Sequence, residues 1–80
     1  MRRVAVLGVG ALDGAATNEA DEVIVVDPSP AALLEVLARV QDGRYAFLLG
    51  ELPVLPLPDA WVDEIVGASG DDPEVTRIRR

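Results

Sequence analysis

Two glycines and one carboxylate form the sequence pattern that could do chemistry. Gly8 and Gly10 follow an apolar run that begins at Val4, and Asp27 ends a second apolar run. Glycines let a backbone turn sharply and approach a ligand closely, and an acid about 20 residues on can accept hydrogen bonds from ribose hydroxyls. The pattern predicts a nucleoside site at the carboxyl edge of a sheet. A structural interpretation stays open, in which the glycines pack a helix on a strand and Asp27 leads into a helix.

The composition of the 80-residue chain excludes several other chemistries. It contains no His, no Cys and no Lys, so it lacks an imidazole base, a thiolate and a Schiff-base lysine. Its net charge of −7 disfavours binding to nucleic acid or to an anionic membrane, because both need a basic face. No run approaches the roughly 20 apolar residues of a membrane span, and no signal-peptide core follows the start. We expect a cytoplasmic protein.

The elements that must position these residues follow an α/β pattern. Four apolar runs predict strands, at residues 4–9, 23–26, 45–49 and 61–66. A short helix is expected over residues 13–20, and a longer one over 31–41 with Ser29 as its N-cap and Pro30 at its first position. Right-handed crossovers then predict a small Rossmann-like half-domain, a mostly parallel sheet of order 3-2-1-4 with helices on one face.

The rest of the chain adds no second domain, so residues 1–80 are expected to form one. Gly43 lies where a C-terminal cap of the longer helix belongs. Residues 52–60 contain three prolines and predict an irregular connection. Residues 67–73 are expected to form a Gly/Asp-rich turn, and residues 74–80 a short edge strand or a frayed tail, with the strand slightly favoured.

Four segments together resemble the N-terminal half of class I S-adenosylmethionine (SAM)-dependent methyltransferases. They are the glycine turn, the Asp27–Pro30 turn, the Gly50–Glu51 step and the Pro-rich Leu55–Asp59 loop. The resemblance implies that the glycine turn passes under the methionine and ribose of SAM, that Asp27 holds the ribose hydroxyls, and that Glu51 and Leu52 lie beside the adenine. The implied cofactor-binding residues are Gly8, Val9, Gly10, Asp27, Pro28, Glu51 and Leu52; no catalytic or metal-binding residue is implied.

The chain also departs from the family pattern. Val6 stands where the family usually has an acid, Leu12 stands where a third glycine is usual, and the later strands are missing. We therefore expect a truncated methyltransferase-like protein, with SAM or S-adenosylhomocysteine as its ligand, that does not methylate alone. One alternative is a non-catalytic dimeric interaction or regulatory module. A second is a binder of NAD-type dinucleotides, because Gly8, Gly10 and Gly14 also fit that turn.

The expected strands are apolar on both faces, and such strands need cover on both. The two expected helices would lie on one face, because right-handed crossovers place them there. The other face would expose several hundred Å² of apolar surface, more than a soluble monomer tolerates. The sequence therefore predicts a homodimer or a completing partner protein.

Overall fold

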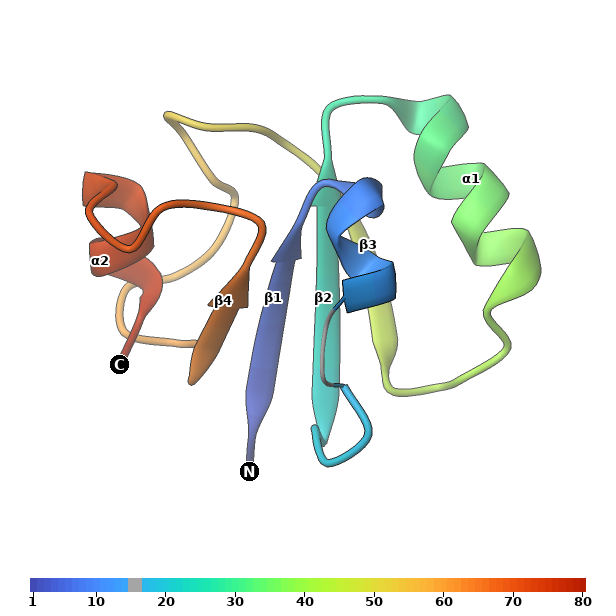
Figure 1. Ribbon diagram of the computed structural model, residues 1–80, viewed down its shortest axis with the longest axis horizontal. Coiled ribbons are helices and arrows are strands. Elements are labelled where there is room, and N and C mark those ends of the chain that lie inside the picture. Colours follow the sequence, from blue (N-terminus) through green and yellow to red (C-terminus); the bar gives the residue numbers. More distant parts are fainter. Residues whose placement is uncertain (15–16) are drawn as a thin grey trace.

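A four-stranded parallel sheet of order β3-β2-β1-β4 forms the centre of the computed structural model, which describes residues 1–14 and 17–80 (Figure 1). The strands are β1 (Arg3–Leu7), β2 (Glu22–Asp27), β3 (Tyr45–Leu49) and β4 (Glu64–Val66). In the central register, Val6 lies opposite Val25 of β2 and Val66 of β4. The predicted fold class and strand order are confirmed.

The longer helix, α1 (Pro30–Arg39), begins as its sequence predicts. Ser29 is the N-cap, and its side-chain oxygen accepts a hydrogen bond from the N–H of Ala32. The predicted end at Gly43 is wrong, because Val40 caps the helix and donates its N–H to the carbonyl of Val36.

The shorter helix differs from the prediction. A 3-10 helix, η1 (Val9–Gly14), follows β1 almost directly, where we expected a helix over residues 13–20. The N–H of Ala11 donates a hydrogen bond to the carbonyl of Gly8, so the helix begins directly after β1 rather than at residue 13. Ala15 and Ala16, in the middle of the expected helix, lie outside the described residues.

The fourth strand is shorter than the predicted run 61–66, because residues before Glu64 pair elsewhere. The N–H groups of Trp61 and Val62 both donate to the carbonyl of Ile78. Val62 also forms an isolated parallel bridge with Arg79. Residues 61 and 62 thus pair with the C-terminal segment, and the strand that joins the sheet begins at Glu64.

The predicted edge strand or tail over 74–80 is wrong, because this segment forms α2 (Pro73–Ile78). Asp72 caps the helix by accepting a hydrogen bond from the N–H of Glu74 at 2.9 Å. Pro73 occupies the first helical position, where its missing N–H costs nothing. Arg77 pairs with Glu74 one turn away and stabilises the helix.

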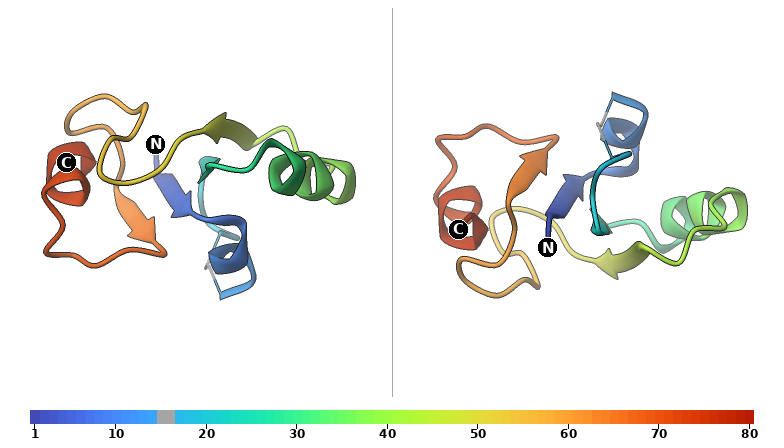
Figure 2. Two further views of the ribbon diagram at one scale, coloured as in Figure 1. Left: turned by 90° about the horizontal axis from the view of Figure 1, so that it is seen from above. Right: turned by 90° about the horizontal axis from the view of Figure 1, so that it is seen from below.

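One face of the sheet packs against η1 and α1, as the crossover rule predicts. Buried valines of β1 and β2, including Val4 and Val25, contact Leu33 of α1 and have Val9 and Leu12 of η1 beside them. Figure 2 shows η1 and α1 on the same side of the strands.

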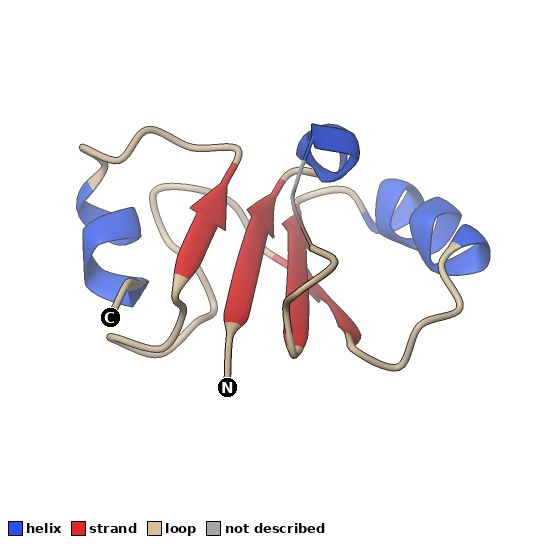
Figure 3. Ribbon diagram, turned by 60° about the horizontal axis from the view of Figure 1, so that its bottom comes forward, coloured by secondary structure: helices blue, strands red, loops and turns tan. Residues whose placement is uncertain are grey.

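The other face is covered within the chain, so the predicted bare face is wrong. Leu55 and Leu57 of the Pro-rich loop and Ile78 of α2 pack on Ala5 and Ile24. Figure 2 shows the loop and α2 on the side opposite η1, and Figure 3 shows α2 beside β4 at one end of the sheet and α1 beside β3 at the other. Because this face is already covered, it gives no reason to expect a homodimer.

None of the described helices is both long and apolar enough to cross a membrane.

Candidate functional site

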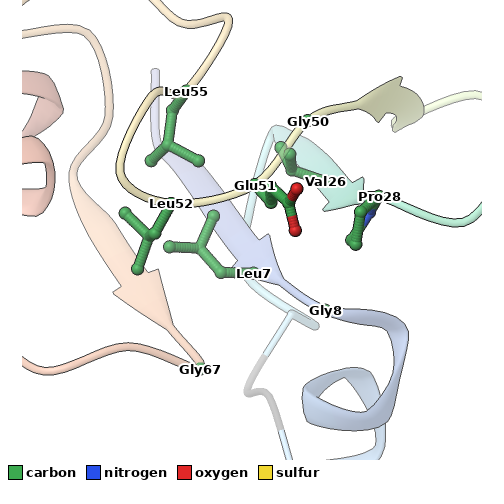
Figure 4. A pocket seen from close by; sticks show the side chains of 9 residues that line it. All are labelled: Leu7, Gly8, Val26, Pro28, Gly50, Glu51, Leu52, Leu55 and Gly67. Carbon is green, nitrogen blue, oxygen red and sulfur yellow. The ribbon is translucent and has the colours of Figure 1, made fainter.

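The carboxyl ends of the strands surround a cavity of about 180 Å³, which we call the strand-end pocket (Figure 4). This edge is where open parallel sheets generally bind ligands. Its nine lining residues come from the ends of all four strands and from the Pro-rich loop: Leu7, Gly8, Val26, Pro28, Gly50, Glu51, Leu52, Leu55 and Gly67.

The structure brings together some of the predicted cofactor-binding residues and not others. Four of them line the strand-end pocket: Gly8, Pro28, Glu51 and Leu52. Three do not line it: Val9, Gly10 and Asp27. Binding of SAM by these residues stays a prediction.

Asp27 is used by the fold itself. Its side chain is buried, at 9% exposure, and its two carboxylate oxygens accept hydrogen bonds from the N–H of Val9 at 2.9 Å and of Ser29 at 2.8 Å. Its backbone carbonyl accepts a further bond from the N–H of Gly50. Asp27 therefore ties together the ends of β1, β2 and β3, in agreement with the structural interpretation that the sequence left open.

Gly67 is one of five lining residues that sequence reasoning did not name as binding residues, together with Leu7, Val26, Gly50 and Leu55. It has φ +93°, and a Cβ added there would lie 2.3 Å from the carbonyl oxygen of Leu7. Gly8 has a similar φ of +91°, but an added Cβ would meet nothing within 4 Å. Each glycine directly follows a strand, and this shared position is the sequence signal that could have identified Gly67 as a pocket residue.

The Pro-rich wall of the pocket is held by α2. Arg77 donates hydrogen bonds to the carbonyls of Leu55 and Leu57, and the carboxylate of Glu74 accepts one from the N–H of Leu55 at 2.7 Å. The hydrogen bonds from Arg77, and then that from Leu55, lower the pKa of Glu74 to about 2. This network fixes the loop over the sheet.

A second hollow lies at the β3 edge of the sheet. We call this hollow the α1–β3 groove. It measures about 310 Å³, and all its lining residues are apolar: Pro30, Leu33, Leu34, Leu37, Phe47 and Leu49. Leu34 is 64% exposed and Leu49 is 56% exposed. The sequence pattern does not indicate this groove, because an apolar stripe on a helix normally marks a buried face.

The backbone of β3 is also open along this edge. Val23 donates its N–H to the carbonyl of Arg44, and Gly50 donates to Asp27, so even-numbered residues of this segment face β2. In a parallel strand, successive residues direct their backbone N–H and C=O groups alternately to the two sides of the strand. Phe47 and Leu49 therefore point these groups away from β2 and out of the sheet. Among the described strands, none pairs with this side of β3.

Comparisons with known proteins give one structural match of note. No protein-family model matches the chain, and neither does any curated protein. A solved complex between the Haloferax volcanii Trm112 methyltransferase activator and a putative methyltransferase matches at a TM-score of 0.70 and 25% identity. The alignment covers 80% of this chain, which spans only 30% of the matched chain.

This match corrects the functional expectation. The matched structure is an assembly of a methyltransferase activator with a second protein, and it fits the alternative of a non-catalytic interaction module. The prediction of a truncated methyltransferase-like protein is therefore wrong, whereas binding of SAM stays a prediction. Binding of a partner protein by this chain is a proposal, because the chain spans only 30% of the matched chain, and a homodimer is not shown.

Proposed function

We propose that this protein is a non-catalytic interaction module whose partner protein binds along the edge of β3 and in the α1–β3 groove. The observation that carries the proposal is the outward-facing backbone of Phe47 and Leu49 beside the exposed side chains of Leu34 and Leu49. The occupant is an extended, apolar and basic segment of the partner, added as a further strand.

Strand addition explains why this edge is unprotected. Natural sheets usually block an edge with charged side chains or proline, which prevents unwanted pairing. The sequence of β3, Tyr-Ala-Phe-Leu-Leu, contains neither. In an added strand the main chain would supply hydrogen bonds, and alternate side chains would enter the groove beside Leu34 and Leu37.

Charge favours a partner other than a second copy. The net charge of the chain is −7, so two copies repel each other, whereas a basic partner is attracted. Exposed apolar groups beside an open edge would then supply the affinity, and the charge would supply the rate of encounter.

The structural match supports association with a protein. It is a complex of a methyltransferase activator and a putative methyltransferase. Assemblies of a methyltransferase with its activator are therefore the first class in which to seek the partner.

A calorimetric titration with synthetic peptides tests the proposal. A peptide of alternating valine and lysine should bind the full chain, and one of alternating valine and glutamate should bind far more weakly. Leu34→Ser should weaken binding because it removes a wall of the groove. Val54→Ser is the matched control, since Val54 is 74% exposed and lies outside the groove.

Three results would overturn the proposal. The first is no heat with either peptide. The second is binding that Leu34→Ser leaves unchanged. The third is sedimentation as a homodimer that buries the β3 edge, which would assign the surface to a second copy.

A further inference from the structure

The strand-end pocket is small and apolar, and it shares no lining residue with the α1–β3 groove. Its volume of about 180 Å³ compares with about 30 Å³ for one water molecule in the liquid, so it suits a ligand of about six non-hydrogen atoms. Pockets for drug-sized ligands are larger, about 300–1,000 Å³. Its aliphatic walls include Leu7, Val26 and Leu52 (Figure 4).

Glu51 supplies the only charged side chain among the nine lining residues. Its carboxylate appears in Figure 4 with the aliphatic walls around it. None of the ion pairs formed by the described part of the chain includes Glu51. Glu51 is exposed, so its carboxylate lies at the rim of the pocket, where it can attract the cationic end of a ligand whose aliphatic part lies between the walls.

The surroundings select against other ligand charges. No arginine lines the pocket, and the net charge of the chain is −7, so an anion would be repelled. A neutral polar ligand would leave the carboxylate without a charged partner. The combination of aliphatic walls and one acid instead matches a cation on an aliphatic stem, because the stem packs against the apolar walls and the cation pairs with the carboxylate.

We infer that the strand-end pocket binds an alkylammonium group, a short aliphatic stem that ends in a cation, with the stem against Leu7 and Leu52 and the cation at Glu51. The group has two sources, a free small amine or the side chain of a lysine on a bound protein. Both present the same chemistry to the pocket. This inference does not depend on the proposed strand addition at β3.

An NMR titration of the ¹⁵N-labelled full chain with n-butylammonium chloride tests the inference. The amide signals of Gly8, Leu52 and Gly67 should shift in a saturable way. Glu51→Gln should reduce the affinity about two- to fivefold, the usual effect of losing a solvent-exposed ion pair. Glu35→Gln, an exposed acid on α1, is the matched control and should leave the affinity unchanged.

Two further arms separate the contributions and the sources. Leu52→Phe should fill the cavity and abolish binding, whereas Val54→Phe, on the exposed side of the same loop, should not. 1-Butanol and butyrate, which keep the stem and change the head, should bind more weakly than n-butylammonium. N-acetyl-lysine methylamide stands for the protein source, and tighter binding than n-butylammonium would assign the pocket to a partner's lysine.

Several results would overturn the inference. They are the absence of saturable shifts with both amines, equal affinity for 1-butanol and n-butylammonium, and an affinity that Glu51→Gln does not change. Because the pocket and the groove share no residue, none of these results would alter the peptide titration at β3, and failure of that titration would leave the pocket result standing.

Discussion

The buried carboxylate of Asp27 accepts a hydrogen bond from the backbone N–H of Val9 at 2.9 Å, so the end of β2 is tied to the start of η1. A second bond from Ser29 places the same carboxylate at the start of α1. An acid that the sequence offered as a ribose ligand is thus part of the framework. Asp27 therefore has a structural role, and it does not line the strand-end pocket.

Replacing Asp27 should destabilise the fold. Asp27→Ala removes the acceptor of two backbone N–H groups near the sheet, and the expected loss is about 2–3 kcal/mol of unfolding free energy, measured by urea denaturation. Asp71→Ala, at an exposed acid, should change stability by no more than about 0.5 kcal/mol. Equal stability of the two variants would contradict the structural role.

The cover of the second sheet face depends on α2. Ile78 is 0% exposed and packs in the cluster with Ala5 and Ile24, so Ile78→Ala should lower the unfolding free energy by about 2–5 kcal/mol. Val54→Ala, at an exposed position, should be close to neutral. If both variants unfold at the same urea concentration, α2 does not cover the sheet.

Gly67, which follows β4, and Gly10, which lies in η1, should respond differently to substitution. Gly67→Ala places a Cβ 2.3 Å from the carbonyl oxygen of Leu7 at φ +93°, so its cost should exceed about 1–2 kcal/mol. Gly10→Ala meets nothing within 4 Å and should be nearly neutral. Thermal unfolding of both variants measures the difference, and a neutral Gly67→Ala would rule out the close approach of β1 and β4 at this point.

Acid should loosen the Pro-rich loop through Glu74. Its pKa is about 2 in the folded chain against an ordinary value of 4.5, so its stabilising effect is complete above about pH 4.5 and disappears as the pH falls towards 2. Urea midpoints of the wild type and Glu74→Gln should therefore differ at pH 7 and converge near pH 2. Glu35→Gln serves as the control, and a gap that stays constant with pH would contradict the pairing with Arg77.

The open edge of β3 predicts opposite effects of proline at neighbouring positions. Leu49→Pro removes an N–H that faces away from β2, so the chain should stay folded and lose peptide binding. Leu48→Pro removes an N–H that bonds within the sheet and should unfold the chain. Circular dichroism and the peptide titration report the two effects, and a Leu49→Pro variant that still binds would exclude strand addition.

The sheet could be predicted from sequence because its strands are continuous apolar runs. Val4, Val23 and Phe47 lie in such runs, and the crossover rule then leaves few possible strand orders. The cap at Ser29 followed by Pro30 likewise marks the start of α1.

The elements that the sequence did not predict lack a clear period in the spacing of their apolar residues. In the Pro-rich loop, Leu55 and Leu57 are buried by contacts with distant residues such as Ile78, which no local pattern records. The start of α2 did carry a signal, since Asp72 followed by Pro73 is a cap followed by a first-turn proline. The helix is so short that its apolar residues show no convincing stripe.

The site was predicted only in part, for a related reason. Glycines and acids at strand ends correctly indicated the carboxyl edge, and Glu51 and Leu52 do line the pocket. Whether an acid such as Asp27 faces a ligand or the backbone depends on side-chain direction, which spacing does not determine. The exposure of Leu34 depends in turn on which edge of the sheet stays open.

Hydrogen exchange at the amide of Leu49, measured by NMR with and without the valine–lysine peptide, tests the central claim most directly. Strand addition would engage the outward N–H groups of Phe47 and Leu49, so their exchange should slow on binding. Ala46 and Leu48, which already face β2, should change far less. Unchanged exchange at Leu49 under saturating peptide would contradict the account.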